Sequence, residues 1–254
     1  MKCIDLSVPL EDSPSEPLRV IIERQSHSDS AGIMAQMLGA KVADLPEGLG
    51  WANDKIIASS HNGTHVDAPW HYYPTCNGTN ARTIDQMPLE WFFSDGVVLD
   101  FSTLPKGSLI SVDALKSELT RINYQLKSFD IVLIRTDADL LWGTQEYFDA
   151  GSGMTAESTS WLIDQGIRVM GTDAWGWDQP FWAMRKRFRE TGDPGILWEA
   201  HRVGRYKEYC HIEKLANLRS LPNPFGFKVS CFPVKLTGGS AGWTRVVALI
   251  DETQ

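Results

Sequence analysis

Four side chains able to bind a metal ion fall within eleven residues of this chain, and this stretch restricts the local fold more than any other. The stretch reads HNGTHVDAPWH and contains His61, His65, Asp67 and His71. Gly63 and Pro69 disfavour an α-helix here, because glycine weakens helices and proline breaks them. Extended backbone brings alternate side chains to one face instead. His61, His65 and Asp67 all stand at odd positions, so we expect them to converge.

Two imidazoles and one carboxylate on a common face suit Zn²⁺, Mn²⁺ or Fe²⁺. Gly63 lies between them and adds no side chain to fill the space that an ion needs. A lone histidine on a strand is more often a hydrogen-bonding residue, but three of the chain's six histidines fall in this stretch. His71 follows Pro69 and is the one we expect to be free of metal. A neutral imidazole beside such a site is suited to act as general base.

Composition limits the classes of partner. The chain has 254 residues and a formal net charge of −8, which disfavours binding driven by nucleic-acid phosphates or anionic membranes. The basic cluster Arg185–Arg189 is flanked by acidic residues in an acidic protein, as is typical of a solvated helix face. No signal peptide or uncharged apolar stretch of about 20 residues is evident. We expect one domain over 1–254, cytoplasmic, with no nucleic-acid or membrane partner.

Strands and helices alternate in the sequence pattern, which predicts a mixed α/β or α+β domain. Alternation and β-branched content predict strands at 3–8, 55–60, 96–101, 131–135, 167–171, 227–236 and 244–250, the last two joined by a glycine-rich turn. Apolar spacing and capping residues predict helices at 111–122, 155–163, 180–190 and 212–217. The four scattered cysteines fit reduced, mostly buried thiols.

The pattern His-x-Gly-Thr-His-x-Asp-x-Pro-x-His resembles the signature of the cyclase-like metal hydrolases, the family of bacterial kynurenine formamidase and isatin hydrolase. The resemblance extends to the opening strand with Asp5, to Asp173 at a strand end, and to His201 followed by Glu213. It implies a swivelling β/β/α domain and assembly as a homodimer or homotetramer.

The resemblance also implies roles for single residues. His61, His65 and Asp67 would bind one metal ion, and Asp67, His201 and Glu213 would form a second or outer site. His71 would act as general acid and base. One or two ions of Zn²⁺ or Mn²⁺ are both compatible with it. Lys214 stands where the family often has Asn, and the segment 174–200 is longer and more aromatic than in compact formamidases.

Together these features predict metal-dependent hydrolysis of a carbon–nitrogen bond other than a peptide bond, or of a carbon–oxygen bond. The substrate would be a small amide, lactam, lactone, ester or formamide. Trp70, Trp175 and Trp177 are candidates for binding it, although aromatic clusters also form cores and subunit interfaces.

Two other classes of function remain open. Gly238–Gly242 matches the Gly-x-Ser-x-Gly motif of serine hydrolases around Ser240. A strand rather than a helix is predicted after it, which favours a hairpin turn. A non-catalytic protein that binds metal or ligand would keep His61, His65 and Asp67 but would not need His71.

Overall fold

The computed structural model describes residues 1–251 of the 254-residue chain. The chain divides into two compact units, Met1–Pro17 with Ser60–Gln254 (unit 1) and Leu18–Ser59 (unit 2). Every residue of the predicted metal site belongs to unit 1. The single-domain organisation expected from composition stays a prediction.

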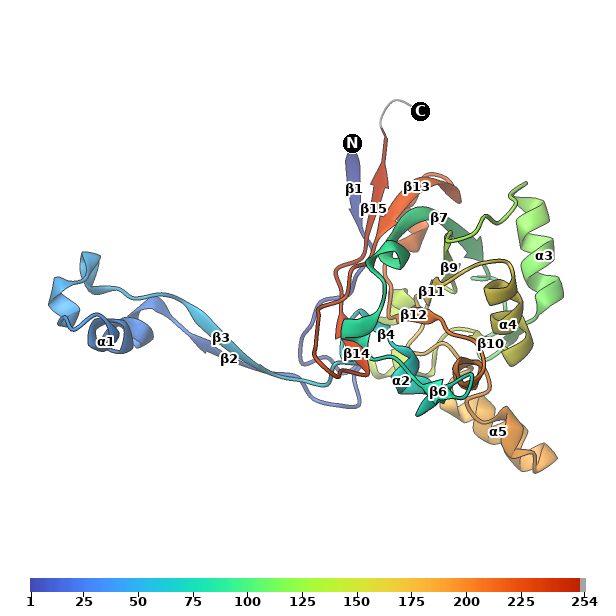
Figure 1. Cartoon of the computed structure of the whole chain (residues 1–254), viewed down its shortest axis with the longest axis horizontal. Helices are drawn as coiled ribbons and strands as arrows, with labels where there is room; N and C mark the ends of the chain where they lie inside the picture. Colours follow the sequence, from blue (N-terminus) through green and yellow to red (C-terminus); the bar gives the residue numbers. More distant parts are fainter. Residues whose placement is uncertain (252–254) are drawn as a thin grey trace. The chain divides into compact units, whose positions relative to one another are not determined.

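Unit 1 is built on a nine-stranded sheet (Figure 1). In order across the sheet the strands are β1 (Lys2–Asp5), β15 (Val247–Ile250), β13 (Phe225–Ser230), β7 (Phe93–Asp100), β9 (Ile131–Arg135), β11 (Val169–Thr172), β12 (Cys210–Glu213), β4 (His65–Asp67) and β14 (Ala241–Trp243). Strands β7, β9, β11 and β12 run parallel, whereas the strands on both sides of them pair antiparallel. The mixed α/β class predicted from the sequence is confirmed.

Smaller elements surround this sheet. They are the strand pairs β8 (Leu109–Ile110) with β10 (Gly153–Met154) and β5 (Thr75–Cys76) with β6 (Thr79–Asn80), and the helices α2 (Pro69–Tyr72), α3 (Val112–Arg121), α4 (Ala156–Asp164) and α5 (Phe181–Thr191). The side chains of Ser111 and Thr155 cap α3 and α4 by accepting a backbone N–H three residues on. Ser and Thr are favoured at this position, so these two residues are the sequence signals that predict where the helices begin.

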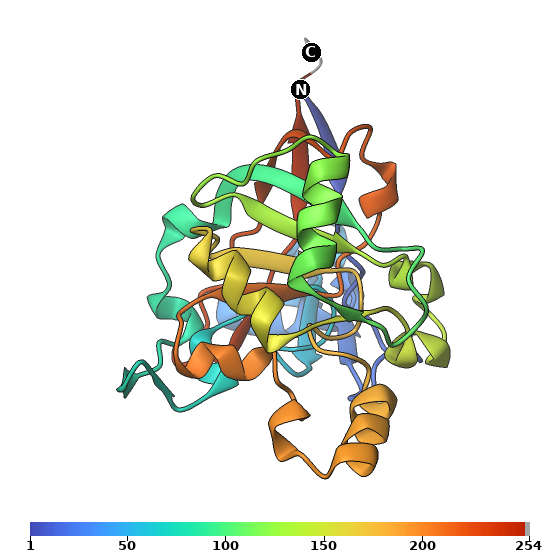
Figure 2. The same ribbon diagram turned by 90° about the vertical axis from the view of Figure 1, so that its right-hand side faces the viewer.

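The central strands are buried on both faces, which explains their continuous apolar sequence. In β9, Val132 and Ile134 pack in one core cluster with Leu115 of α3 and Leu162 of α4. Figure 2 shows α3 and α4 lying over this face of the sheet.

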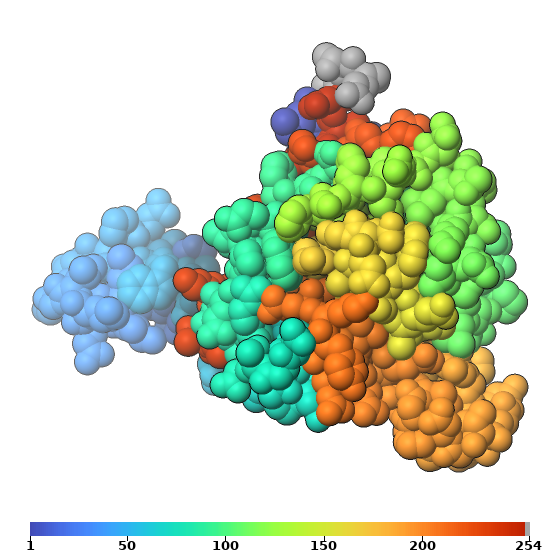
Figure 3. Space-filling view, turned by 45° about the vertical axis from the view of Figure 1, so that its right-hand side comes forward, coloured from blue at the N-terminus to red at the C-terminus, as the bar shows by residue number. Residues whose placement is uncertain are grey.

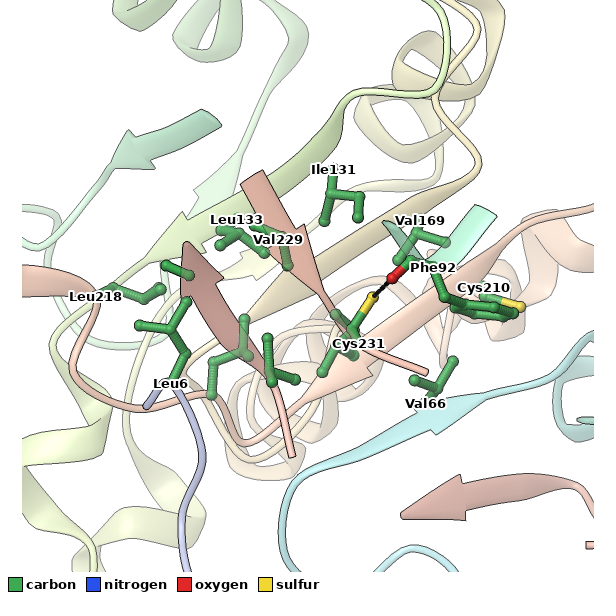
Figure 4. Close-up of a cluster of buried hydrophobic side chains, with 14 of the residues drawn as sticks. Leu6, Val66, Phe92, Ile131, Leu133, Val169, Cys210, Leu218, Val229 and Cys231 are labelled. Carbon is green, nitrogen blue, oxygen red and sulfur yellow. Dashed lines mark hydrogen bonds between the residues drawn. The ribbon is translucent and has the colours of Figure 1, made fainter. Parts of the chain in front are cut away.

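The alternate side chains of β9 belong to the other core. Ile131 and Leu133 share a cluster with Val66 of β4 and Val229 of β13, which lie on opposite sides of β9 in the sheet (Figure 4). One core reaches both flanks of the sheet because the sheet curls around it.

Two sequence predictions about the C-terminal third are wrong. Residues 212–217 do not form a helix: Cys210–Glu213 is strand β12, and Lys214 and Asn217 take left-handed φ angles of 60° and 59° that a helix cannot contain. The run 227–236 overlaps strand β13, the run 244–250 contains strand β15, and these two strands do pair. They are not joined by a simple hairpin turn, since β14 lies between them and pairs with β4.

Unit 2 is a two-stranded ribbon with a helix. Strand β2 (Ile21–Gln25) pairs antiparallel with β3 (Asn53–Ile57). Helix α1 (His27–Met37) lies between them in the chain and was not predicted. It begins at a capping box in which Ser26 and Asp29 satisfy each other's backbone N–H groups. Two short 3-10 turns, η1 (Val42–Asp44) and η2 (Pro46–Gly48), follow it.

The cysteine prediction is confirmed: Cys76, Cys210 and Cys231 are buried, Cys3 is exposed, and all four are free thiols. None of the helices in the described range is long and apolar enough to cross a membrane.

Gly153 packs against the backbone that leads into the aromatic segment. A Cβ atom there would lie 2.0 Å from the backbone nitrogen of Gln179 and 2.2 Å from the carbonyl carbon of Asp178. We therefore expect Gly153→Ala to lower the free energy of unfolding by about 1–3 kcal/mol, measured by urea denaturation. The control Gly32→Ala in α1 meets no atom within 4 Å and should be neutral or stabilising. Equal stability of Gly153→Ala and wild type would contradict this packing.

Candidate metal centre

Two adjacent strands bring four polar side chains to one face of the sheet. In the antiparallel pairing of β4 with β12, His211 lies opposite Asp67 and Glu213 lies opposite His65. Because alternate residues of a strand share a face, all four side chains point the same way. His211 Nε2 is 3.1 Å from Asp67 Oδ2, and His65 Nε2 is 3.2 Å from Asp67 Oδ1. The alternation predicted for His65 and Asp67 is present.

His61 reaches the same cluster from a turn rather than from a strand. Its Nδ1 lies 2.9 Å from Asp67 Oδ1, and its Nε2 lies 3.0 Å from the hydroxyl of Ser240. Gly63 takes a φ of 62°, which favours glycine. A Cβ on Gly63 would face Leu10 and Pro9 at 3.5–3.6 Å, so the expectation that it leaves room for an ion is wrong. Its role is to let the chain turn.

His71 and His201 lie beside the carboxylates from two further segments. His71 lies on α2, with Nε2 3.6 Å from Asp67 Oδ2. His201 begins the 3-10 turn η8 (His201–Arg205), with Nε2 3.4 Å from Glu213 Oε1 and 3.8 Å from Asp67 Oδ2. The other nitrogen of His201, Nδ1, lies 2.5 Å from Asp178 Oδ2. That contact fixes the ring with Nε2 facing the cluster.

The tautomer of His65 is fixed in the same manner. Its Nδ1 donates to the carbonyl of Gly63 at 2.8 Å, which leaves the lone pair of Nε2 directed at the carboxylates.

The central carboxylate lacks hydrogen bonds. Asp67 is fully buried, and neither of its oxygens has a hydrogen-bond partner of good geometry. Both ring nitrogens of His211 are also buried without such a partner. Buried polar atoms are almost always hydrogen-bonded, so a set that is not requires another explanation. Imidazole and carboxylate atoms that converge without bonding to each other fit a divalent cation such as Zn²⁺ or Mn²⁺.

Two overlapping ligand groups can be drawn from the cluster. Asp67, His201, His211 and Glu213 form one, and His61, Asp67 and His71 form the other, with ligand atoms in each group within 4.8 Å of one another. Asp67 is common to both. His65 contacts both groups: its Nε2 lies 3.3 Å from His61 Nδ1 and 3.6 Å from Glu213 Oε2.

Charges in the cluster are mutually dependent. Burial would raise the pKa of Asp67, but His71, His61 and His65 hold that pKa well below its usual range. Burial would lower the pKa of His201, but Asp178 and Glu213 raise it to about 10. Burial does lower the pKa of His71, to about 4, against the attraction of Asp67. His71 is therefore neutral at pH 7 and has a lone pair with which to accept a proton.

A cavity of about 150 Å³ opens beside the cluster. His61, His71, His201 and Glu213 are among the residues that line it. Phe148, Trp175, Phe181, Met184 and Trp198 form its aromatic and apolar wall. Much of this wall comes from the segment around α5, at the lower right of Figure 3.

The structure separates the three candidate tryptophans. Trp175 lines the cavity, while Trp70 and Trp177 do not. Trp177 is buried in a core, stacks on His211 and donates its indole N–H to Thr159. Its backbone N–H donates to Glu213 Oε1 at 3.0 Å. Trp70 is 45% exposed on α2.

His211 was not among the predicted site residues, yet it lies in the centre of the cluster. It stands two positions before Glu213, the spacing that shares a face in a strand. Because residues 212–217 were predicted to be helical, the shared strand face of His211 and Glu213 was not recognised.

Comparison with known proteins places the chain. The model of the family described as "Putative cyclase" matches residues 4–179, more than half of the sequence. The chain belongs to the putative cyclase family. A kynurenine formamidase from Erythrobacter litoralis is 26% identical over 198 residues, which are 76% of this chain and 74% of that protein.

Several other relatives match a shorter part of this chain. A kynurenine formamidase from Bacillus mycoides is 25% identical over 119 residues, 47% of this chain and 49% of that protein. The chain therefore spans about half the length of such curated relatives in these matches. An isatin hydrolase solved with the product analogue thioisatinate shares the fold, with a TM-score of 0.78, 21% identity, and coverage of 99% of this chain and 93% of the other.

Proposed function

We propose that this chain is a metal-dependent hydrolase that cleaves a carbon–nitrogen or carbon–oxygen bond of a small amide, lactam, lactone, ester or formamide. The observation that carries the proposal is the environment of Asp67. Its carboxylate is fully buried among five histidines, has no hydrogen-bond partner of good geometry, and lies beside a cavity. Kinship with kynurenine formamidases supports the reaction class.

In this proposal His61, His65 and Asp67 hold one divalent ion, Zn²⁺ or Mn²⁺. Asp67, His201 and Glu213 hold a second ion or form an outer site, and His211 joins them because its Nε2 lies 3.3 Å from Glu213 Oε1. A bound cation would polarise the substrate carbonyl and make water a nucleophile near neutral pH.

The chain's own residues supply proton transfer and orientation. His71 Nε2 faces Asp67, and the ring borders the cavity, so a proton taken from water there can return to the leaving nitrogen or oxygen. Trp175, Phe181 and Trp198 would hold a flat ring of the substrate against the aromatic wall. An aryl formamide such as N-formylkynurenine, or a cyclic aryl amide such as an isatin-like lactam, suits such a wall.

The experiment that tests this proposal combines elemental analysis of the purified protein with a screen of formamides, lactams and lactones. We expect near-stoichiometric metal and turnover of at least one class. Chelation should abolish turnover, and adding Zn²⁺ or Mn²⁺ should restore it. Negligible metal content with no response to either ion would overturn the proposal.

A second candidate function draws on one observation. His61 Nε2 lies 3.0 Å from Ser240 Oγ, and His61 Nδ1 lies 2.9 Å from Asp67 Oδ1. Serine, histidine and aspartate are therefore arranged in the spatial order of a serine hydrolase triad. The local backbone disagrees, because strand β14 follows Ser240 where a nucleophile elbow needs a helix. The carbonyl of Ser240 also accepts the N–H of Ala68, which ties the residue into the sheet edge.

Ser240→Ala separates the two functions. Under the metal mechanism the hydroxyl only accepts from His61, so we expect kcat to fall less than 10-fold, as for one neutral hydrogen bond. A nucleophilic Ser240 would lose at least about 10³-fold on the same change. The measurement is steady-state kinetics on a substrate found in the screen, with and without chelator. A loss of that size that chelation does not affect would establish the serine mechanism.

We also propose that the chain forms a homodimer or homotetramer. Unit 2 exposes several large apolar side chains for its size, among them Ile33, Met37, Trp51, Ile56 and Ile57. Exposed apolar clusters are typical of protein–protein interfaces. Light scattering coupled to size exclusion should give two or four times the monomer mass of 28.4 kDa. A monomer at micromolar concentration would contradict the proposal.

A further inference from the structure

A buried ion pair lies directly beside the proposed metal centre, outside both ligand groups. The ammonium group of Lys214 lies 2.9 and 3.0 Å from the two carboxylate oxygens of Glu16, and both side chains are only 2% exposed. The same ammonium donates to the backbone carbonyl of His61 at 2.6 Å. Removing charges from water is costly, so such a pair is kept only where its geometry is good.

Both partners bind the turn that carries His61. While Lys214 holds the carbonyl of His61, Glu16 Oε1 accepts the backbone N–H of Gly63 at 2.7 Å. The hydroxyl of Thr64 donates to the backbone carbonyl of Lys214 at 2.5 Å. These three contacts fix the turn from His61 to Thr64. This turn precedes β4 and is not itself paired in the sheet.

The backbone of Lys214 is itself held in an unfavourable conformation. Its φ of 60° lies in the left-handed region, which costs a residue with a side chain of order 1 kcal/mol. Lys214 directly follows Glu213 at the end of β12, so this turn redirects the chain immediately after a proposed ligand. The strain is tolerated because the side chain is fully bonded.

Lys214 has no N–H left for a substrate. An ammonium has three N–H donors, and the two oxygens of Glu16 with the carbonyl of His61 account for all three. Lys214 and Trp175 both line the cavity, and the ring centroid of Trp175 lies 5.0 Å from the ammonium. This is cation–π distance. The ammonium thus joins the His61 turn to one tryptophan of the aromatic wall.

We infer that Lys214 and Glu16 are positioning residues that hold His61 in ligating geometry and Trp175 in the cavity wall. This role rests on the proposed function, because it presumes that His61 binds a metal ion.

The test removes both charges together, so that no unpaired charge stays buried. In the double variant Lys214→Met, Glu16→Gln, the side-chain volumes are nearly kept. Purified wild type and variant are titrated with Co²⁺, and the affinity and the visible absorption spectrum of the bound ion are recorded. We expect affinity to fall about 10- to 100-fold, as for other residues that orient ligands, with a changed spectrum. The control is Lys207→Met, Asp164→Asn, which removes an ion pair of 2.6 Å that belongs to neither ligand group nor to the cavity lining.

Kinetics give a second measurement that a purely structural role would not move. At saturating metal, loss of the Trp175 contact should raise KM for aromatic substrates several-fold while kcat changes less. If the double variant does not fold, Glu16→Asp keeps both charges but shortens the side chain that reaches Gly63, and it should still weaken Co²⁺ binding.

The outcomes separate the two proposals. A wild type that binds no Co²⁺ would overturn the proposed function and this role with it. A wild type that binds Co²⁺, with folded variants that match it in affinity and spectrum, would overturn only the positioning role.

Discussion

His71→Ala should retain its metal and lose between about 10² and 10⁴ in kcat. The imidazole borders the cavity, and burial lowers its pKa to about 4, so it is a neutral base throughout the neutral range. Its Nε2 lies 3.6 Å from Asp67 Oδ2, close enough to exchange a proton with water bound beside that carboxylate. A group that carries a proton without holding the ion should affect turnover alone.

The geometry makes this experiment decisive, because His71 also belongs to a ligand group with His61 and Asp67. If His71 were a ligand, alanine would lower both the metal content and the rate. Metal content measured on the same samples as kcat distinguishes these outcomes. His27→Ala is the matched control, since His27 is exposed in unit 2. Full activity of His71→Ala on a confirmed substrate would contradict the mechanism and favour a role in metal or ligand binding alone.

Local pattern was sufficient to predict the β4 half of the site. The odd spacing of His65 and Asp67 places them on one face wherever the strand lies, because side-chain alternation is a property of the backbone itself. The turn at His61 was less predictable. Its conformation depends on contacts with Glu16 and Lys214, which lie 45 residues before it and 153 residues after it in the sequence.

The β12 half required information that a single sequence does not contain. Whether residues 211 and 213 share a face depends on whether the segment is a strand or a helix, since two helical residues so spaced point about 200° apart. A helix was predicted over 212–217, but pairing with β4 and β11 overrode that local preference. Register then placed His211 opposite Asp67, a contact between residues 144 positions apart.

Unit 2 shows the opposite case, a helix with start signals but little amphipathic pattern. Helix α1 buries only Ser30, Ala31 and Ala35, and exposes Ile33 and Met37. Apolar periodicity is the main signal for a helix, so one with so small a buried face is easily missed. The capping box at Ser26 was the signal available.

Asp67→Asn should abolish specific metal binding, with affinity reduced at least about 100-fold, because it removes the carboxylate common to both ligand groups. Asparagine has nearly the same shape, so the effect would not come from a cavity. In wild type, Zn²⁺ at 100 times its dissociation constant stabilises the folded state by about 2.7 kcal/mol. Thermal unfolding with and without Zn²⁺ should therefore show a shift for wild type and none for the variant.

Asp139→Asn is the informative control, because Asp137, Asp139 and Asp173 form another group whose oxygens could hold an ion. That group is already engaged: Asp173 accepts the backbone N–H groups of Thr136 and Asp137 at 2.8–2.9 Å. Arg135 also binds Asp137 at 2.7 Å. Asp67 has no comparable hydrogen bonds, so the ion should prefer it, and Asp139→Asn should keep the full Zn²⁺ shift. The reverse result, a shift lost in Asp139→Asn and kept in Asp67→Asn, would move the metal to the acidic group and leave the five histidines without their proposed purpose.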